Sequence, residues 1–382
     1  MSEPDSAYVR AWLVALRAPG LAGGTLINAL ETASDIRALV SDPACCGAGL
    51  SAESRTALKH PDLARIESDE AWLDQPDRHL VTWDQSRYPS LLRRIPSPPA
   101  ALFVHGDPEL LWRPQLAVIG SRNPTAAGLE FARDFATELV RCGLAVTSGL
   151  AAGIDSAAHE AALDAGGSTV AVCGTGPDQV YPASSRKLAQ RIPGAGALVT
   201  EFPTGFPPRR QHFPSRNRII SGLALGVLVI EAGLNSGTLI TARQAAEQGR
   251  EVFALPGSLH NPLSRGCHRL IREGARLVES VHDIIEELGP LAGQLAADLR
   301  AELETGVGDK IGDDKTADTP LLNDPDYARL WDALGHDARS VEELVGLTGL
   351  QAREVSSMML MLELRGRVRA EAGGRYVRCG DA

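Results

Sequence analysis

Between about residue 80 and residue 289, short apolar runs alternate regularly with amphipathic stretches of helical period. The runs are nearly continuous, as in VLVIEA at 227–232, which is typical of strands covered on both faces of a sheet. After the first run, Phe131, Phe135 and Leu139 fall on one helical face at i, i+4 and i+8. The alternation predicts an α/β fold: a Rossmann-like, doubly wound, mostly parallel sheet within a domain at 80–290. The predicted strands are 115–120, 144–149, 169–174, 197–202, 226–231, 251–255 and 276–279.

The block at 1–75 has a different pattern, in which short helical stretches alternate with turns. One predicted helix ends at Pro19-Gly20 and the next begins after Gly23-Gly24. A helix–PGxxGG–helix stretch can place backbone amides against a phosphodiester, but it can equally be a plain helical turn with glycine caps. No basic cluster follows the turn, so the structural interpretation is favoured.

The regular pattern also ends on the other side of the α/β block. Residues 291–322 are rich in Gly, Asp and Pro without an apolar period, which predicts a flexible acidic linker. Residues 323–382 read as three helices followed by a hairpin at Gly373-Gly374, the order of a winged-helix domain. Such a domain can read DNA or dock a protein, and this question stays open. The basic residues of this unit concentrate in Arg365, Arg367, Arg369, Arg375 and Arg378.

Three glycine-rich turns follow predicted strands of the α/β block. They are Gly120-Ser121-Arg122, the turn from Ser148-Gly149 to Gly153, and the turn from Gly233 through Ser236-Gly237-Thr238. In an open parallel sheet such turns gather at the carboxyl edge of the strands, where ligands bind. Helix N-termini and glycine amides there present N–H donors to anions. Three such turns predict a phosphate-bearing ligand.

A basic stretch without any acidic residue separates Glu201 from Glu231. Guanidinium groups can bind phosphates, and rings can stack on unpaired bases, so this composition suits single-stranded nucleic acid. The alternative is a solvated loop anchored by its Phe side chains. The position beside three anion-ready turns favours nucleic acid. The residues concerned are Arg209, Arg210, Arg216, Arg218, Phe206, His212 and Phe213.

Several single residues near these turns have two possible roles. Arg122 stands where a dinucleotide fold would have glycine, and it could clamp a phosphate directly. Asn123 before Pro124 is predicted to be a helix N-cap, and Ser121 either caps or touches phosphate. His159 has no second ligand at metal-binding spacing, so it is predicted to be buried or at a helix end. Asp155 is expected in the first turn of a helix, where the dipole favours a carboxylate.

Composition limits the function classes. The chain has 382 residues and a formal net charge of −10, so nucleic-acid binding requires a local basic patch. No apolar run has the length of a membrane span and the N-terminus lacks a secretory pattern, which predicts a cytoplasmic protein. The six cysteines form no CxxC pair, so reduced thiols are expected and metal binding is not. They are Cys45, Cys46, Cys142, Cys173, Cys267 and Cys379.

Six motifs in order carry a resemblance to a known family: AVIGSRNPT, TSGLAAGIDSAAH, VCGTGPDQVYP, TEFPTGFPPRRQHFPSRNRIISGLA, VIEAGLNSGTLITARQAAEQGREVFALPG and GCHRLIREGA. Together they resemble the DNA-processing protein A (DprA, or Smf) family over most of residues 80–290. The flanks resemble, more weakly, its SAM-like domain and its winged helix. The resemblance implies a homodimer that is not an enzyme, binds and protects incoming single-stranded DNA during natural transformation, and helps to load the RecA recombinase.

The resemblance also implies where DNA binds. It places the basic pocket on Arg122 and on Phe213, Arg216, Asn217 and Arg218, with amides from the third turn. The residues predicted to contact DNA are Ser121, Arg122, Ser148, Gly149, Gly153, Arg209, Arg210, His212, Phe213, Arg216, Asn217, Arg218, Ser236, Gly237 and Thr238. No catalytic residue, metal ligand or cofactor is predicted.

Two alternative functions belong to other classes. The third turn resembles the GGxGTxxE signature of nucleotide phosphoribohydrolases of the lysine-decarboxylase-like family. In this chain Thr241 occupies the glutamate position, and a threonine cannot act as the required carboxylate. A pure scaffold that docks partners through its winged helix is also possible, but it leaves the arginine-rich stretch unexplained.

Overall fold

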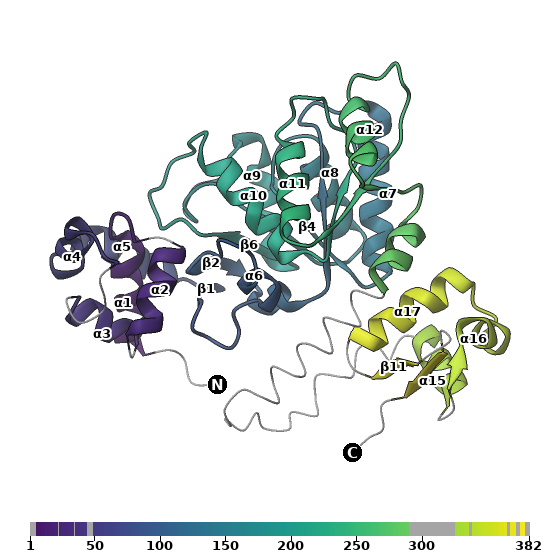
Figure 1. Ribbon diagram of the computed structural model, residues 1–382, viewed down its shortest axis with the longest axis horizontal. Coiled ribbons are helices and arrows are strands. Elements are labelled where there is room, and N and C mark those ends of the chain that lie inside the picture. The colour runs from purple at the N-terminus through teal and green to yellow at the C-terminus, as the bar shows by residue number, and fades with distance from the viewer. Residues whose placement is uncertain are drawn as a thin grey trace. The chain divides into compact units, whose positions relative to one another are not determined.

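The computed structural model describes residues 5–21, 23–33, 35–43, 49–289, 325–335, 338–364, 367–371 and 375–378. Contacts divide the chain into two compact units, Met1–Leu277 and Val278–Ala382, and each is described by itself (Figure 1). The predicted linker at 291–322 and the Gly373-Gly374 turn lie outside the described residues, as do Arg365, Cys45, Cys46 and Cys379. The boundaries predicted for the domains stay predictions.

Nine strands of the described residues form the sheet of the larger unit, in the order β1-β2-β6-β5-β4-β3-β7-β8-β9. Neighbours from β6 to β9 pair in parallel, whereas β1–β2 and β2–β6 are antiparallel. The chain moves outward from β3 to β6 and then returns to the other side of β3, so the winding direction switches between β3 and β7. The strands are β1 (Arg78–Thr82), β2 (Ala101–Gly106), β3 (Gln115–Ile119), β4 (Ala145–Ser148), β5 (Thr169–Val172), β6 (Ala197–Thr200), β7 (Gly226–Val229), β8 (Glu251–Ala254) and β9 (Arg276–Leu277).

All seven predicted strands are present, and the prediction of a doubly wound, mostly parallel sheet is confirmed. Each predicted range ran one or two residues too long, because the carboxyl end of each run already belongs to a turn. The antiparallel extension, β1 and β2, was missing from the prediction. The apolar run at 101–104 gives a signal for β2.

Helices cover both faces of this sheet (Figure 1). Alternate residues of β5 show this directly: Val170 and Val172 pack in the cluster that contains Ile219, whereas Ala171 packs with Leu188. Continuous apolar runs are therefore required in the central strands, since both faces are buried. The helices and 3-10 turns around the sheet are α6 (Ser90–Arg93), η1 (Pro108–Trp112), α7 (Ala126–Arg141), α8 (Ile154–Asp164), η2 (Ala183–Ser185), α9 (Arg186–Arg191), η3 (Ile192–Gly194), α10 (His212–Leu223), α11 (Thr238–Glu247) and α12 (Arg265–Arg272).

The buried face of α7 differs in one residue from the predicted stripe. Phe135 and Leu139 are buried, but Phe131 is 47% exposed. Ala132 and Ala136 complete the buried face instead. A step of four residues turns a helix by more than one full turn, so three residues at this spacing drift around the helix, and the first lies at its edge.

The N-terminal helices share a hydrophobic core with β1 and β2. The Trp72 and Phe103 rings meet edge to face, with centroids 5.9 Å apart. A buried polar network joins the same helices to the segment after β6: the Arg17 guanidinium donates to Asp69 at 2.5 and 2.7 Å and to the Thr204 carbonyl at 3.0 Å. The helices are α1 (Ser6–Arg17), α2 (Gly24–Thr32), α3 (Ile36–Ser41), α4 (Ala52–Lys59) and α5 (Leu63–Leu73).

The turn between α1 and α2 packs against α4, another helix of the N-terminal block. Gly20 adopts φ +71°, a left-handed conformation that favours glycine. The Ser54 hydroxyl, on α4, donates to the Pro19 carbonyl at 2.7 Å. The turn is therefore bonded to another helix of the N-terminal block. This packing agrees with the structural interpretation of the PGxxGG stretch.

Among the described residues of the smaller unit, the helices α15, α16 and α17 and a three-stranded antiparallel sheet pack around Leu330, Leu344 and Met359. Their order confirms the predicted winged-helix fold, to which the structure adds the short strand β10. Ser340 and Glu343 form a capping box at the start of α16, which accounts for that helix boundary. The elements are α15 (Pro325–Leu334), β10 (Arg339–Ser340), α16 (Val341–Thr348), α17 (Ala352–Leu364), β11 (Val368–Glu371) and β12 (Arg375–Arg378).

His159 is fully buried on α8, as predicted, and its ring must stay neutral. The Thr169 hydroxyl donates to the Val146 carbonyl at 2.6 Å, so it accepts from Nδ1 of His159, 2.7 Å away. The Nε2 atom of His159 has no partner in the described structure, and burial lowers the histidine pKa to about 3. In the unfolded chain this pKa returns to about 6.5.

The stability of the protein should therefore fall on acidification below about pH 6.5, because only the unfolded chain takes up this proton. The loss should approach about 1.4 kcal/mol per pH unit between about pH 6 and pH 4. Denaturant unfolding of the parent and of His159→Asn at several pH values measures it. The variant keeps a donor toward Thr169 and should show a flatter profile; two parallel profiles would contradict the assignment.

Candidate nucleic-acid interface

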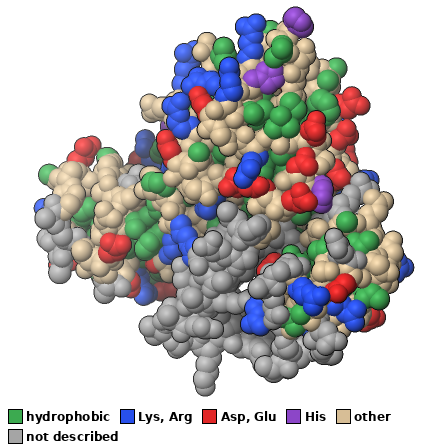
Figure 2. Space-filling model, turned by 45° about the vertical axis from the view of Figure 1, so that its right-hand side comes forward, with side chains coloured by type: hydrophobic (Ala, Val, Ile, Leu, Met, Phe, Trp, Pro, Cys, Tyr) green, Lys and Arg blue, Asp and Glu red, His purple; other side chains and the backbone are tan. Residues whose placement is uncertain are grey.

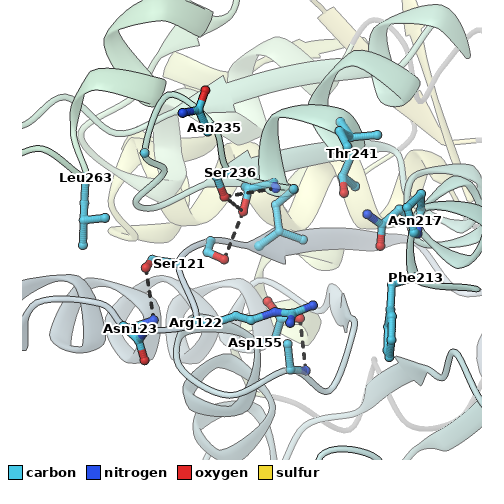
Figure 3. Close-up of a pocket in the computed structure, with 18 of the residues that line it drawn as sticks. Ser121, Arg122, Asn123, Asp155, Phe213, Asn217, Asn235, Ser236, Thr241 and Leu263 are labelled. Carbon is cyan, nitrogen blue, oxygen red and sulfur yellow. Dashed lines mark hydrogen bonds between the residues drawn. The ribbon is translucent and has the colours of Figure 1, made fainter. Parts of the chain in front are cut away.

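A pocket of about 1000 Å³ opens where the winding of the sheet changes direction, at the carboxyl ends of β3 and β7 (Figure 3). The first and third glycine turns and the start of α10 form its walls. The position is the one at which doubly wound sheets bind ligands. Of the residues predicted to contact DNA, the pocket is lined by Ser121, Arg122, Arg210, Phe213, Arg216, Asn217, Ser236, Gly237 and Thr238.

The three turns pack on one another through backbone that only glycine permits. Gly153 caps α8 with φ +85°, and a Cβ there would overlap the Ser121 carbonyl. That carbonyl accepts from the backbone N–H of Ile154 at 3.1 Å, which joins the first turn to the second. The Thr238 hydroxyl donates to the Gly120 carbonyl at 3.0 Å, which joins the third turn to the first (Figure 3). Gly153 therefore shapes the pocket without lining it.

The start of α7 corrects the role predicted for Asn123. The N-cap is Thr125, whose hydroxyl accepts from the Gly128 N–H at 3.0 Å, so the prediction that Asn123 caps this helix is wrong. Pro124 precedes the cap instead of following it. Asn123 donates its backbone N–H to the Ser121 hydroxyl at 3.1 Å, so Ser121 closes the turn.

Glu231, which the sequence marked only as the end of the basic stretch, holds this helix start in place. Its carboxylate accepts from the backbone N–H of Thr125 at 2.9 Å and from the Thr125 hydroxyl at 2.7 Å. Asn261 donates to it as well, at 3.2 Å. The carboxyl end of β7 is thus bonded to the helix that follows β3, which fixes the width of the pocket.

Arg122 and two aromatic rings form one side of the pocket. The Arg122 side chain is exposed and extends toward Phe213, with the guanidinium carbon 5.7 Å from the ring centroid (Figure 3). The rings of Phe213 and Tyr181 lie 5.5 Å apart and are tilted by 44°. A free guanidinium beside accessible rings offers a contact for phosphate and a surface for base stacking.

Arg216 has the opposite environment and lies beneath the pocket, only 4% exposed. It donates to the Val172 carbonyl at 2.9 Å, and a Cβ at Gly149 would overlap its guanidinium. Asp155 lies nearby, in the first turn of α8 as predicted, and accepts from the Gly149 and Ala151 N–H groups. Burial lowers the pKa of Arg216, and the Asp155 charge opposes that shift; burial likewise raises the pKa of Asp155, and Arg216 opposes it.

Other residues of the basic stretch and the turns lie outside the pocket. Arg218 forms an ion pair with Glu201 at 2.5 Å, with both side chains 15% exposed. His212 is buried and stacks on Phe202, with centroids 4.3 Å apart. Ser148 is also buried, and its hydroxyl donates to the Val118 carbonyl at 2.6 Å. The predicted contact residues outside the pocket lining are Ser148, Gly149, Gly153, Arg209, His212 and Arg218.

The pocket also contains residues that the sequence reasoning did not select. Tyr181 follows the predicted strand 169–174, so its position after a strand end was a usable signal. Leu263 comes from the segment between β8 and α12, and Arg265 is the first residue of α12; neither had such a signal. The lining residues that were not selected as contacts include Asp155, Tyr181, Asn235, Leu263 and Arg265.

The charged surface, the possible metal ligands, the cysteines and the helix lengths describe the surroundings of the pocket further. On the face drawn in Figure 2, several basic side chains gather near the top of the larger unit, and elsewhere on this face basic and acidic side chains are mixed, although the whole chain is acidic. Among the described residues, no group of three or more His, Cys, Asp or Glu side chains is placed to hold a metal ion. Cys142, Cys173 and Cys267 form no disulfide bond with one another. None of the described helices combines the length and apolar character needed to cross a membrane.

Comparison with known sequences identifies two segments of the chain. Residues 79–289 match the family of DNA recombination-mediator protein A, and residues 314–374 match the DprA winged helix domain. Protein Smf of Escherichia coli is 42% identical over 314 residues, which cover 82% of this chain and 80% of that protein. The DNA processing protein DprA of Bacillus subtilis is 45% identical over 230 residues, which cover 60% of this chain and 76% of that protein.

Solved structures give the same result. The X-ray structure of DNA processing protein A from Streptococcus pneumoniae matches with a TM-score of 0.66 and 37% identity, over 73% of this chain and 97% of that one. A structure of the Helicobacter pylori protein, described for its single-stranded DNA binding mode, matches with a TM-score of 0.50 and 30% identity, over 55% of this chain and 95% of that one. This chain therefore belongs to the DNA recombination-mediator protein A (DprA/Smf) family.

Proposed function

We propose that this protein binds single-stranded DNA in the pocket between β3 and β7, without sequence preference and without catalysis. The observation that carries the proposal is the exposed Arg122 guanidinium beside the Phe213 and Tyr181 rings. Phosphate contacts and base stacking both occur on single strands, whereas the bases of a duplex are already stacked on each other. Membership of a family with a relative described as binding single-stranded DNA supports the same function.

The cellular role belongs to this proposal as well. The family name and the motif resemblance support a protein of natural transformation that protects incoming single-stranded DNA in the cytoplasm. The same resemblance supports a homodimer that helps to load the RecA recombinase. In this role four of the predicted contact residues outside the pocket act as its frame: Gly149 and Gly153 give room, and Ser148 and His212 hold strand and helix in place.

The competing hydrolase function lacks a suitable carboxylate. Thr241 lines the pocket at the position where the signature requires glutamate. Asp155 is the one carboxylate among the described residues that line the pocket, and it is only 7% exposed and accepts two backbone N–H bonds. The scaffold alternative leaves the exposed Arg122 without a role.

The first prediction concerns the nucleic acid. Labelled oligo-dT should bind more tightly than a duplex of equal length, because stacking needs unpaired bases. Affinity should fall steeply as salt rises, since each neutralised phosphate of a single strand contributes a slope of about −0.7 in log K against log salt. A fluorescence-anisotropy salt series measures both. Equal or tighter binding to the duplex at moderate salt would refute the proposed function.

The second prediction compares two arginines that line the pocket, one exposed and one buried. Arg122→Ala should weaken oligo-dT binding by about 1.5–3 kcal/mol without changing the melting temperature, because the exposed side chain is a charge-assisted phosphate contact. Arg216→Ala should lower the melting temperature, because it leaves Asp155 and the Val172 carbonyl buried without their partner.

Arg113→Ala is the matched control for the second prediction. This exposed arginine precedes β3, at the edge of the sheet opposite the pocket. The Arg113→Ala variant should have the same affinity for oligo-dT and the same melting temperature as the parent protein. An Arg122→Ala protein that binds oligo-dT as tightly as the control would remove Arg122 from the interface.

The third prediction concerns catalysis. Nucleoside monophosphates should release no free base during incubation with the protein, and Thr241→Glu alone should not create activity, because residues that act as a unit are not additive. Chromatography of the nucleotide mixture measures base release. If the rate of base release rises with protein concentration and release disappears in the Gly237→Trp variant, the protein is a hydrolase and the proposed binding function is wrong.

A further inference from the structure

A second cavity, of about 520 Å³, opens between the N-terminal helices and the segment after β6. Its lining includes Arg65 from α5 and Phe206 and Arg209 from the segment that leads to α10. Both arginines are exposed, and Phe206 is half-buried. The proposed function does not use this cavity.

The two cavities share one ridge of chain, residues 209–213. Arg209 lines the second cavity while its neighbour Arg210 lines the main pocket. In the same way, Phe213 lines the main pocket while His212 points to the other side and stacks on Phe202. The two cavities thus meet the chain at two consecutive residues, Arg209 and Arg210.

A cluster of three rings borders the second cavity. The His212 ring stacks on Phe202, Phe202 stacks on Phe206 with centroids 5.9 Å apart and planes 22° apart, and the Phe206 and His212 centroids lie 6.4 Å apart. Phe206 is the member of the cluster that lines the cavity, so an unpaired base in the cavity can stack on its ring.

The floor of the cavity is rigid and fully paired, so a ligand would meet only its rim. Arg17 and Asp69 are almost completely buried and bonded to each other and to Thr204. On the rim, Asp178 accepts from the Gly205 N–H, and Arg65 pairs with Asp62 at 3.1 Å with the two side chains 69% and 56% exposed. Such an exposed pair is weak, so a phosphate can replace the Asp62 carboxylate.

We propose that this cavity is a second subsite for single-stranded DNA, in which Arg65 and Arg209 contact phosphates and Phe206 stacks on a base. The inference rests on the proposed function of the main pocket and extends it. The N-terminal helical block thereby becomes part of the DNA-binding surface through Arg65, and the bound strand is longer than the main pocket alone can hold.

The test compares oligo-dT of about six nucleotides, which occupies the main pocket, with oligo-dT of about twenty nucleotides, which reaches both sites. Arg65→Gln should weaken binding of the long oligonucleotide about five- to tenfold and reduce its salt slope by about 0.7, because one phosphate contact is lost. Binding of the short oligonucleotide should not change. Arg113→Gln is the matched control and should leave both unchanged.

A gain-of-binding variant gives an independent measurement. Asp62 is the N-cap of α5 and accepts from the Arg65 N–H at 3.4 Å. Asp62→Asn keeps a capping side chain and releases the Arg65 guanidinium. It should bind the long oligonucleotide about two- to threefold more tightly, because no internal carboxylate competes with phosphate.

The outcomes separate this inference from the proposed function. If Arg65→Gln binds the long oligonucleotide like the parent, or weakens both lengths equally, the second subsite is refuted. A failure of Asp62→Asn to tighten long-oligonucleotide binding would likewise refute the phosphate contact at Arg65. Arg122→Ala, measured in parallel, should weaken both lengths; if it weakens neither, the main pocket itself fails as the DNA site.

Discussion

The buried guanidinium of Arg216 is the constraint on which the pocket depends. It comes from α10, donates to the Val172 carbonyl at the end of β5 and lies against Gly149 at the end of β4. A charge at this depth is costly unless it has partners, and Asp155 from α8 provides the opposite charge. Because Asp155 also accepts the Gly149 and Ala151 N–H groups, one cluster fixes two strand ends and two helices. The second glycine turn is held in place by this cluster.

The four arginines of the basic stretch show how environment divides one residue type among different tasks. Arg216 is buried beneath the pocket, and Arg218, in the middle of the same helix, is held by Glu201. Arg209 and Arg210 are exposed and line different cavities. An exposed guanidinium keeps its donors available for phosphate, whereas a paired one has already used them. The functional basic surface is therefore narrower than the number of arginines in the stretch.

The sequence was sufficient to predict the parallel strands and the sheet edge at which the pocket lies, but not β1 and β2 or the orientation of individual side chains. Continuous apolar runs located the parallel strands, and the glycine turns located the carboxyl edge, because both depend on local pattern and on general rules of chain connection. The burial of Arg216 could not be read from the stretch itself, since it depends on Asp155 and Gly149, which lie far away in the chain. The N-cap at Thr125 was missed for the same reason: Glu231, from another strand, fixes the helix start two residues beyond Asn123.

The polar network around Arg17 connects the N-terminal helices to the segment that leads from β6 to α10. Thr204 donates its backbone N–H and its hydroxyl to Asp69, so the segment that leads to α10 is bonded to α5. Buried and fully paired networks hold their parts in one arrangement, because any displacement leaves a charge without its partner. The ridge at 209–213 begins five residues after Thr204, so the N-terminal block limits where Arg209 and Arg210 can lie. The helices that precede the sheet thus help to define the position of the ridge that separates the two cavities, even though the main pocket lies at the switch point between β3 and β7.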